Sequence, residues 1–432
     1  MAEKKKIVII GGGFAGLKLA RELKGSGFRV VLIDKHNYHQ FQPLMYQVAT
    51  SRLEPSSIAF PLRKVFQYEK DIHIRLAEVE RIDTDLKKVY TDQFIMDYDK
   101  LVVAVGATTN YYGNEELKKF AMPMKSVQES MALRNRILMT FERAICMSED
   151  ESLPLMNFVV VGGGPTGVEL AGALAEMRKY ILPKDYPDRD FSMMKIYLLE
   201  GAQATLGSMS KNAQKYSQLY LEELGVIVKT NTIVESYDGT EVVFKGGGSI
   251  LTKNLIWAAG VKGNTLPGLP KDSIVRGGRY KVDRYQAVAG LKDVYAIGDI
   301  AYMETEKYPH GHPQLANVAI SQAQNLAQNL MNEEKGGVLN AFEYKDKGSM
   351  ATVGKRRAVV DLPNVKFQGW FAWLTWMAVH FWLILSVKNK LTIFINWMMS
   401  YFNNDSTLRI ILRANRSKVT DTMPKPSLEE VS

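Results

Sequence analysis

The sequence predicts an α/β protein with two nested Rossmann-type dinucleotide-binding domains and a C-terminal amphipathic helical region that anchors to a membrane. Three observations support this prediction. A glycine-rich turn follows an apolar strand near the N-terminus, the same arrangement returns at residues 158–169, and an uncharged, tryptophan-rich stretch lies near the C-terminus. The 432 residues suffice for two to three domains with their own cores.

The first glycine-rich turn contains Gly11, Gly13, Phe14, Ala15 and Gly16 and follows the apolar run of residues 6–10. Gly11 permits a tight turn, Gly13 lets the backbone approach a pyrophosphate, and Gly16 lets the following helix pack closely on the strand. The helix N-terminus then faces the anion. Asp34 ends the next apolar strand, where such sites place the acid that binds a ribose hydroxyl. This pattern predicts a dinucleotide site.

The second turn repeats this spacing after the apolar run of residues 158–161. Its residues are Gly162, Gly164, Pro165, Thr166 and Gly167. The following strand, residues 195–200, ends in Glu200, which comes late because residues 176–194 lengthen the crossover. Two nucleotide sites in one chain imply that electrons pass between two cofactors.

The net charge of +9 is uneven, because residues 346–432 contain twelve Lys and Arg against six Asp and Glu. This bias favours an anionic partner, either a membrane or a nucleic acid. Nucleic acid is not expected, because the basic run at residues 355–357 is short and lacks interleaved aromatic residues.

Cys146, expected within a helix, is the one cysteine of the chain. A single cysteine excludes an internal disulfide, a dithiol relay, a structural zinc site and a cysteine-ligated iron–sulfur cluster. We therefore expect a reducing compartment. The first six residues are charged and lead directly into the first strand, without the apolar stretch of a signal peptide.

Several segments connect the two glycine turns. His36 and His39 lie in a polar and aromatic loop, and we expect hydrogen-bonding or structural roles for them and no metal site. Residues 72–82 and 88–97 alternate like a β-meander. The strand over residues 101–108 contains Ala104 and Gly106, whose small size lets a cofactor approach the backbone. Residues 131–147 form a helix that joins the units.

The second unit has its own meander, over residues 226–244, and a strand over residues 255–260. Within residues 293–300, an apolar strand is followed by Gly298 and Asp299. Such an acid can hold the ribityl hydroxyls of a flavin, although an Asp at this point also suits a turn or a helix cap. Residues 313–330 form a long helix.

The return of a strand after the second unit implies a discontinuous first domain. The predicted domains are 1–115 with 275–345, then 116–274, then 346–432.

The tail contains two uncharged stretches, residues 367–387 and 391–404, and five of the six tryptophans. Tryptophan favours the boundary between lipid and water. Polar residues recur at helical spacing in both stretches, which predicts helices that lie in the interface with their polar side on the protein. These residues are Gln368, Thr375 and Ser386, and then Thr392, Asn396, Ser400 and Asn403. Burial in a dimer interface or in an ordinary core is the alternative.

Arg409, Arg413 and Arg416 are spaced to share one helix face that anionic headgroups would attract. A solvated basic face explains this spacing equally well.

Together these motifs resemble the type II NADH dehydrogenases, single-chain flavoproteins that pass electrons from NADH to quinone. The resemblance covers nearly the whole chain. It rests on residues 11–20, 37–50, 104–111, 160–172, 258–261, 296–300 and 350–362, with the hydrophobic tail in the family position. It implies FAD at the first glycine turn and NADH at the second.

The resemblance also implies residue roles. Asp34 would hold the adenosine ribose of FAD, Asp299 would hold its ribityl chain, and Gln42 and Pro43 would lie near the isoalloxazine. The remaining cofactor contacts would come from residues at the same strand ends and helix starts, namely Lys35, Val79, Ala104, Gly106, Gly298, Ala316, Ala259 and Gly260.

Glu169 and Glu200 are the acids that the resemblance assigns to the NADH site. Glu169 would be the catalytic acid beside the nicotinamide and the flavin, although an acid in the first helical turn could simply complement the helix dipole. Glu200 would bind the ribose 2′-hydroxyl. Because a carboxylate repels a 2′-phosphate, NADH should be preferred over NADPH.

The expected acceptor is a quinone, either menaquinone or ubiquinone, contacted by Gln42, Asn317 and Ser321. The family helix at this point commonly reads A-Q-x-A-x-Q. Here Asn317 keeps an amide on a shorter side chain, and Ser321 has none.

The resulting expectation is a non-proton-pumping NADH:quinone oxidoreductase, peripheral on the cytoplasmic face of the inner (cell) membrane. A homodimer is left open. One alternative is a soluble NADH:acceptor flavoprotein reductase that uses a dye, oxygen or a small redox protein. The other is a non-catalytic, nucleotide-sensing binding protein. Sulfide:quinone and disulfide reductases are excluded because they need paired cysteines.

Overall fold

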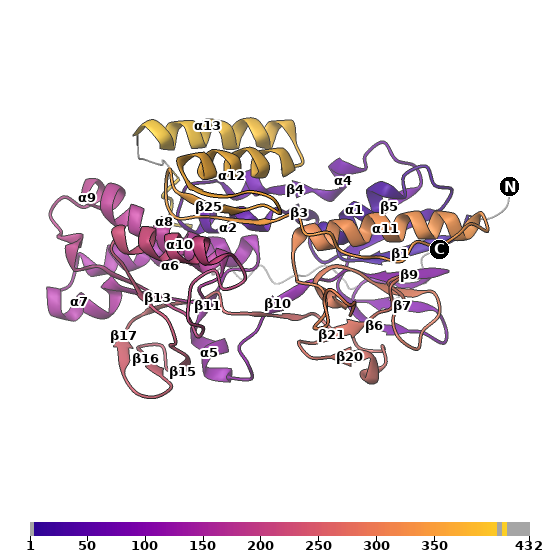
Figure 1. Cartoon of the computed structure of the whole chain (residues 1–432), viewed down its shortest axis with the longest axis horizontal. Helices are drawn as coiled ribbons and strands as arrows, with labels where there is room; N and C mark the ends of the chain where they lie inside the picture. The colour runs from indigo at the N-terminus through magenta and orange to yellow at the C-terminus, as the bar shows by residue number, and fades with distance from the viewer. Residues whose placement is uncertain (1–3, 404–407, 413–432) are drawn as a thin grey trace.

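The computed structural model describes residues 4–403 and 408–412 of the chain. Figure 1 shows two α/β units side by side, with the helices α12 and α13 lying together along one edge of the view. In each unit, a parallel sheet carries helices on one face and a small antiparallel meander on the other.

The first unit is built on a parallel sheet with the strand order β22-β9-β1-β2-β5. Alternate residues of β1 point to opposite faces, as strand geometry requires. Ile7 and Ile9 pack against α1 (Phe14–Glu22) and α11 (Ala316–Glu334), whereas Val8 and Ile10 pack against the meander. The strands of the sheet and the meander are β1 (Lys6–Ile10), β2 (Arg29–Asp34), β5 (Ile72–Leu76), β9 (Lys100–Val103), β22 (Val294–Ala296), β6 (Val79–Asp83), β7 (Lys88–Thr91) and β8 (Ile95–Asp97).

The second unit repeats this plan with the strand order β11-β18-β12-β13-β14. Phe158 and Val160 face the helices, and Val159 and Val161 face the meander. Its elements are β11 (Met122–Pro123), β12 (Asn157–Val161), β13 (Lys195–Leu199), β14 (Val226–Lys229), β18 (Asn254–Trp257), the helices α6 (Val127–Ala144), α8 (Pro165–Glu176) and α10 (Lys211–Glu223), and the meander β15 (Val234–Tyr237), β16 (Glu241–Phe244) and β17 (Ser249–Leu251).

Short elements connect and complete these units. The antiparallel pair β10 (Ala107–Thr109) and β19 (Val261–Gly263) runs between the two units. The other short elements are β3 (Tyr38–Gln40), β4 (Ala59–Pro61), β20 (Ile274–Val275), β21 (Arg279–Lys281), β23 (Ala301–Tyr302), α2 (Met45–Ala49), α3 (Pro55–Ile58), α4 (Leu62–Val65), α5 (Glu115–Phe120), α7 (Glu149–Met156), α9 (Leu182–Asp185), the 3-10 helices η1 (Gln42–Leu44), η3 (Phe191–Met193), η4 (Lys271–Ser273) and η5 (Gly298–Ile300), and the π-helix η2 (Met177–Ile181).

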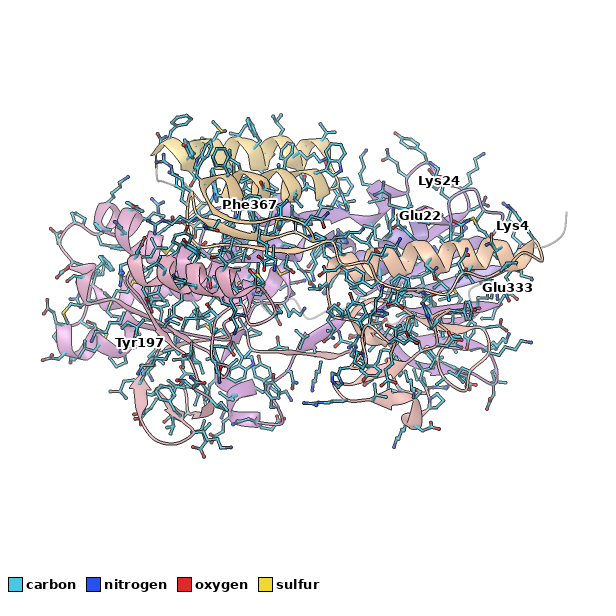
Figure 2. The ribbon with its side chains drawn as sticks, viewed as in Figure 1. Lys4, Glu22, Lys24, Tyr197, Glu333 and Phe367 are labelled. Atoms are coloured by element: carbon cyan, nitrogen blue, oxygen red, sulfur yellow. The ribbon has the colours of Figure 1, made fainter. Side chains whose placement is uncertain are left out.

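The C-terminal layer consists of an antiparallel sheet and the two helices α12 (Trp370–Leu383) and α13 (Val387–Asn403). The strands of the sheet are β24 (Ser349–Thr352), β25 (Ala358–Asp361) and β26 (Lys366–Gly369). Figure 2 shows Phe367 on the ribbon directly beneath α12. In the part of the chain that the structure describes, no helix combines the length and the hydropathy that a membrane span requires.

The exposed and buried sides of α13 differ in polarity. Leu391, Phe394 and Phe402 are exposed, whereas Thr392 and Asn396 are half-buried. The predicted polar stripe therefore lies on the less exposed side of α13, with the exception of Asn403, which is exposed. The apolar side of the helix faces away from the protein.

Some predicted elements of the two units are wrong in detail. Ile72–Leu76 and Val226–Lys229 pair as outer strands of the parallel sheets and do not belong to the meanders. The strand expected over residues 101–108 is divided into β9 and β10, with Gly106 at φ +67° between them. The connecting helix α6 begins earlier than expected, because Ser126 forms a capping box with Glu129. It ends at Ala144, so Cys146 lies beyond the helix and is exposed.

The predictions for the tail are also wrong in part. Gln368 lies in β26 and Ser386 follows α12, so Gln368, Thr375 and Ser386 share no helix face. Arg409 lies in a non-helical segment and forms an ion pair with Asp185. Arg413 and Arg416 lie outside the described residues.

Candidate active site

Two glycine turns lie at the carboxyl ends of β1 and β12 and are built alike. Gly11 has φ +105°, and a β-carbon there would lie 2.4 Å from the Ala104 carbonyl oxygen. Gly162 has φ +109°, and a β-carbon there would lie 2.7 Å from the Ala258 carbonyl oxygen. Only glycine fits at both positions.

The third glycine of each turn lets helix and turn pack closely, because a β-carbon on Gly16 or Gly167 would lie 1.9 Å from the carbonyl oxygen of Gly11 or Gly162. The middle glycines differ, since no atom lies within 4 Å of a β-carbon built on Gly13 or Gly164. The helices α1 and α8 start at this open space with no side-chain cap and no acid in the first turn. Their free N–H groups fit a pyrophosphate.

An acid closes each turn in the same way. The Asp34 carboxylate accepts the Gly12 N–H at 2.5 Å and the His36 N–H at 2.6 Å. The Glu200 carboxylate accepts the Gly163 N–H at 2.5 Å and the Ala202 N–H at 2.7 Å. Burial raises the pKa of Asp34, and the hydrogen bonds from Gly12 and His36 oppose that rise. Both acids are thus fixed at the edge of their glycine turns, where a ribose would lie.

The segment at η5 completes the first site. A β-carbon on Gly298 would lie 3.1 Å from the Ala15 β-carbon, so this segment touches the start of α1. Burial raises the pKa of the Asp299 carboxyl, and the nearby charges of Lys125, 4.0 Å away, and Arg279 lower it. These charges favour an ionised acid that can accept hydrogen bonds from hydroxyl groups.

Aromatic residues line the first turn. Phe14 makes edge contacts with His39 and Phe41, at centroid distances of 5.1 and 5.9 Å. His39 is buried with Nδ1 3.1 Å from the Gly12 carbonyl oxygen, which is the structural role expected for it. No group of three or more His, Cys, Asp or Glu side chains in residues 4–403 and 408–412 could hold a metal ion.

The remaining residues that were predicted to contact the cofactors belong to several elements. Ala104 adjoins Gly11, and Lys35 pairs with Glu78 at 3.6 Å. Pro165 and Thr166 open α8, whereas Ala259 and Gly260 follow β18. Val79 opens β6, Gly106 precedes β10, and Gln42 and Pro43 lie in η1. Ala316, Asn317 and Ser321 are half-buried in the first turns of α11. Of the residues expected to contact a quinone, Gln42 therefore lies in η1, whereas Asn317 and Ser321 lie in α11.

Glu169 lies deep in the molecule, with 7% of its surface exposed. Its Oε1 accepts hydrogen bonds from the Thr352 N–H at 3.2 Å and from the Thr352 hydroxyl at 3.4 Å. Burial raises the pKa of Glu169 to about 8, against the lowering effect of Thr352. The first turn of α8 contains no acid, so the interpretation of Glu169 as a first-turn partner of the helix dipole is wrong.

The surroundings of Glu169 come from distant parts of the chain. Thr352 belongs to the C-terminal layer, and its hydroxyl lies 3.0 Å from the Tyr46 hydroxyl of the first unit. The indole N–H of Trp376 faces the Glu169 carboxyl without completing a hydrogen bond and lowers its pKa. His380 stacks on Trp376 at 4.0 Å, and burial lowers its pKa to about 4. Glu169 therefore lies where both units and the C-terminal layer meet.

Four residues around Glu169 have no role predicted from the sequence, namely Tyr46, Thr352, Trp376 and His380. Tyr46 and Thr352 lie inside the stretches 37–50 and 350–362 that carry the family resemblance, so a signal was present for them. Trp376 and His380 were indistinguishable from the other aromatic residues of the tail.

The two dinucleotide turns, each with its acid, and the buried acid between the units define a two-dinucleotide oxidoreductase. Residues 5–323 match the family model for pyridine nucleotide-disulphide oxidoreductase, and residues 347–404 match the NDH2 C-terminal domain. The chain belongs to the pyridine nucleotide-disulphide oxidoreductase family and, within it, to the type II NADH:quinone oxidoreductases. The expected family, the expected α/β dinucleotide-binding fold and the presence of a C-terminal domain are confirmed.

Individual relatives support this assignment. A type II NADH:quinone oxidoreductase of Mycobacterium tuberculosis is 33% identical, with 93% of this chain and 89% of the relative covered. The external NADH-ubiquinone oxidoreductase 2 of Saccharomyces cerevisiae mitochondria is 27% identical over 93% of this chain and 81% of its own. The fold matches that of NDH2 from Plasmodium falciparum in complex with NADH, with a TM-score of 0.87, 22% identity, and 95% and 100% of the two chains covered.

Proposed function

We propose that this protein is an NADH:quinone oxidoreductase that transfers electrons from NADH through FAD to a membrane quinone. The observation that carries the proposal is the position of Glu169. This acid belongs to the helix of the second dinucleotide turn, yet its hydrogen-bond partner Thr352 comes from the C-terminal layer. A single buried carboxyl group therefore connects the NADH side to the layer that carries the exposed apolar helices.

The residues of the first unit fit FAD. Gly13 and the N–H groups of α1 would hold the pyrophosphate, Asp34 the adenosine ribose and Asp299 the ribityl hydroxyls. When bound, FAD supplies hydride acceptance from NADH and electron delivery to the acceptor. In the second unit, Gly164 and α8 would bind the NADH pyrophosphate, and Glu200 the ribose 2′-hydroxyl.

The side chain of Glu169 handles a proton. With a pKa of about 8, its carboxyl group holds a proton at neutral pH, which is unusual for an acid. It can therefore give up a proton close to the point where charge moves between the two cofactor sites, and take one back afterwards.

The C-terminal layer supports a peripheral position on a membrane surface. Trp370, Phe371 and Trp382 on α12 are exposed, as is the apolar side of α13. Lys388 is exposed and Lys390 half-buried at the start of α13, where they can meet anionic headgroups. We place this surface on the cytoplasmic face of the membrane and propose the domain division 1–115 with 275–345, 116–274 and 346–432.

A soluble NADH:acceptor reductase is the second candidate. It is favoured by Asn317 and Ser321, which replace the two glutamines of the family helix. NADH oxidation with a lipophilic quinone in phospholipid vesicles, compared with ferricyanide in solution, separates the two functions.

We expect rapid turnover with the quinone and a larger loss of this activity than of ferricyanide reduction in Glu169→Gln. Turnover with ferricyanide, but none with quinone, would overturn the proposal in favour of the soluble reductase.

A further inference from the structure

A continuous chain of hydrogen bonds joins α13 to Glu169. The Trp397 indole N–H donates to the Gln47 side-chain oxygen at 2.9 Å, and the Gln47 amide nitrogen donates to the Tyr46 hydroxyl at 3.0 Å. The Tyr46 hydroxyl lies 3.0 Å from the Thr352 hydroxyl, which reaches Glu169 Oε1 at 3.4 Å. The chain crosses from the C-terminal layer through the first unit to the helix of the second dinucleotide turn.

The donor at the outer end fixes the orientation of the Gln47 amide, and this orientation favours one direction for the links that follow. An indole N–H can donate but cannot accept, so the side-chain oxygen of Gln47 must face Trp397. The Gln47 amide then points its N–H at the Tyr46 hydroxyl, which is left to donate its own proton to Thr352. The Thr352 hydroxyl in turn donates to Glu169. Every proton in the chain points toward the buried acid.

This direction favours the ionised form of Glu169. An ionised carboxylate accepts the Thr352 hydroxyl as well as the Thr352 backbone N–H. If the chain ran the other way, the Thr352 hydroxyl would donate to Tyr46 and would offer Glu169 only an acceptor, which suits a protonated carboxyl. The chain therefore opposes the burial that favours the protonated acid.

We propose that Trp397 is a positioning residue for Glu169, because its donor-only indole fixes the direction of the hydrogen-bond chain through Gln47, Tyr46 and Thr352. This inference rests on the proposed function only where it concerns the effect of Trp397 on catalytic turnover. The effect on Glu169 is a property of the folded chain itself.

Other groups around Glu169 do not replace this effect. Tyr46 on α2, itself a link of the chain, adds no charge near Glu169, because burial raises its pKa well above its usual range. His380 on α12 is neutral at physiological pH, since burial lowers its pKa to about 4. Arg52 and Glu176 form an ion pair with each other.

The hydrogen-bond chain depends on how α13 packs against the protein, because Trp397 lies on this helix. Trp397 points inward, whereas Phe394 and Met398, its neighbours on the same helix, are exposed on the apolar side. The same helix thus presents the surface proposed for lipid and donates the first proton of the chain.

The test is a direct titration of Glu169 in the FAD-loaded protein labelled with [5-¹³C]glutamate, with Glu169→Gln used to assign its carboxyl resonance. Trp397→Phe should raise the pKa of Glu169 by about 0.5 to 1 pH unit. Without the indole, the hydrogen-bond chain can adopt either direction, so Glu169 loses the Thr352 hydroxyl donor in only part of the molecules, and the shift is smaller than the loss of a full hydrogen bond to a charged group would give. Thr352→Val, which removes the last hydroxyl, should raise the pKa at least as far.

The double variant separates the chain from packing. If Trp397 acts through Thr352, the combination of Trp397→Phe and Thr352→Val titrates like Thr352→Val alone. Additive shifts, or an unshifted Glu169 in Trp397→Phe, overturn the proposal. Trp373→Phe, a half-buried tryptophan of α12 outside the chain, is the matched control and should leave the pKa unchanged.

Gln47→Met cuts the chain one link further in and should repeat the shift, which keeps the proposal testable if Trp397→Phe folds poorly. Because the titration needs no electron acceptor, a shifted Glu169 in a protein that reduces no quinone would refute the proposed function and leave this inference intact.

Discussion

The glycines of the two dinucleotide turns have different roles, because some are needed for packing of the fold and others leave space for a ligand. Gly16 and Gly167 are required by the fold, because any β-carbon there meets a backbone carbonyl at 1.9 Å. Gly13 and Gly164 are not required by any neighbouring atom, so their small size serves what enters the open space beside them.

This division predicts opposite outcomes for neighbouring substitutions. Gly164→Ala should weaken NADH binding about tenfold, since a methyl group in a tight contact costs about 1–3 kcal/mol, while the melting temperature and FAD content stay unchanged. Gly13→Ala should instead release FAD. Absorbance gives the FAD content and fluorescence titration gives the NADH affinity. Gly167→Ala is the contrasting control, because it should lower the melting temperature.

Glu200 should set the choice between NADH and NADPH. Glu200→Gln removes the charge that opposes a 2′-phosphate, so the ratio of kcat/KM for NADPH to that for NADH should rise about tenfold, or about 1.4 kcal/mol. Glu222→Gln removes an exposed charge from α10 and should leave the ratio unchanged. An unchanged ratio in Glu200→Gln would mean that another residue reads the 2′ position.

Glu169 should make the folded protein less stable as the pH rises. Its pKa is raised from 4.5 to about 8, so the folded state holds a proton that the unfolded state releases across this window. The contribution of Glu169 is complete below pH 4.5 and is lost as the pH rises through 8. Relative to Glu169→Gln, the wild-type melting temperature should therefore fall by about 3 °C between pH 5.5 and 9. If the melting temperatures of the wild type and of Glu169→Gln changed equally with pH, the pKa of Glu169 would not be raised in the folded state.

The residues around Glu169 also show what a sequence does not reveal. Asp34 and Glu200 could be placed in advance, because their positions follow from the local strand–turn–helix spacing. The partners of Glu169 could not, since Thr352 is 183 residues away and the Tyr46–Thr352 contact joins residues 306 apart. Only the assembled fold brings these hydroxyl groups together.

Among the elements, the C-terminal layer departs most from its prediction. Residues 367–387 form one uncharged stretch in the sequence, which predicted a helix. In the structure, residues 366–369 instead pair with β25 as a strand. Backbone pairing accepts most side chains, so composition could not separate β26 from α12. Gly369, at φ +86°, marks the change from strand to helix, and this conformation is readily adopted only by glycine.

The polar stripe on α13 was predictable, because its helical spacing is independent of neighbouring elements. Its orientation predicts how the protein meets lipid. Leu391→Glu combined with Phe394→Glu places two charges on the exposed apolar side, so binding to phosphatidylglycerol-containing vesicles should fall at least about tenfold in a sedimentation assay. The fold should persist, since Leu391 exposes 59% of its surface and Phe394 exposes 50%.

Leu251→Glu, on the meander strand β17 far from α13 in Figure 1, is the control and should bind vesicles like the wild type. Undiminished binding of the α13 variant would assign membrane contact to another surface.

At the scale of the whole molecule, the two units repeat one architecture, with helices, a parallel sheet and a meander in successive layers (Figure 1). This repetition was visible in the sequence because each unit carries its own strand–glycine–helix signature. The junction between the units was not visible, since it depends on the C-terminal layer packing against α8 and α2 at once.

We propose one electron path that runs through two dinucleotide sites to a lipid-facing layer. The most direct measurement follows the flavin absorbance of the purified protein on vesicles, first after anaerobic addition of NADH and then after addition of a lipophilic quinone. We predict yellow protein that bleaches with NADH and regains its colour with the quinone. Protein without flavin, or flavin that NADH bleaches and the quinone leaves reduced, would contradict this account.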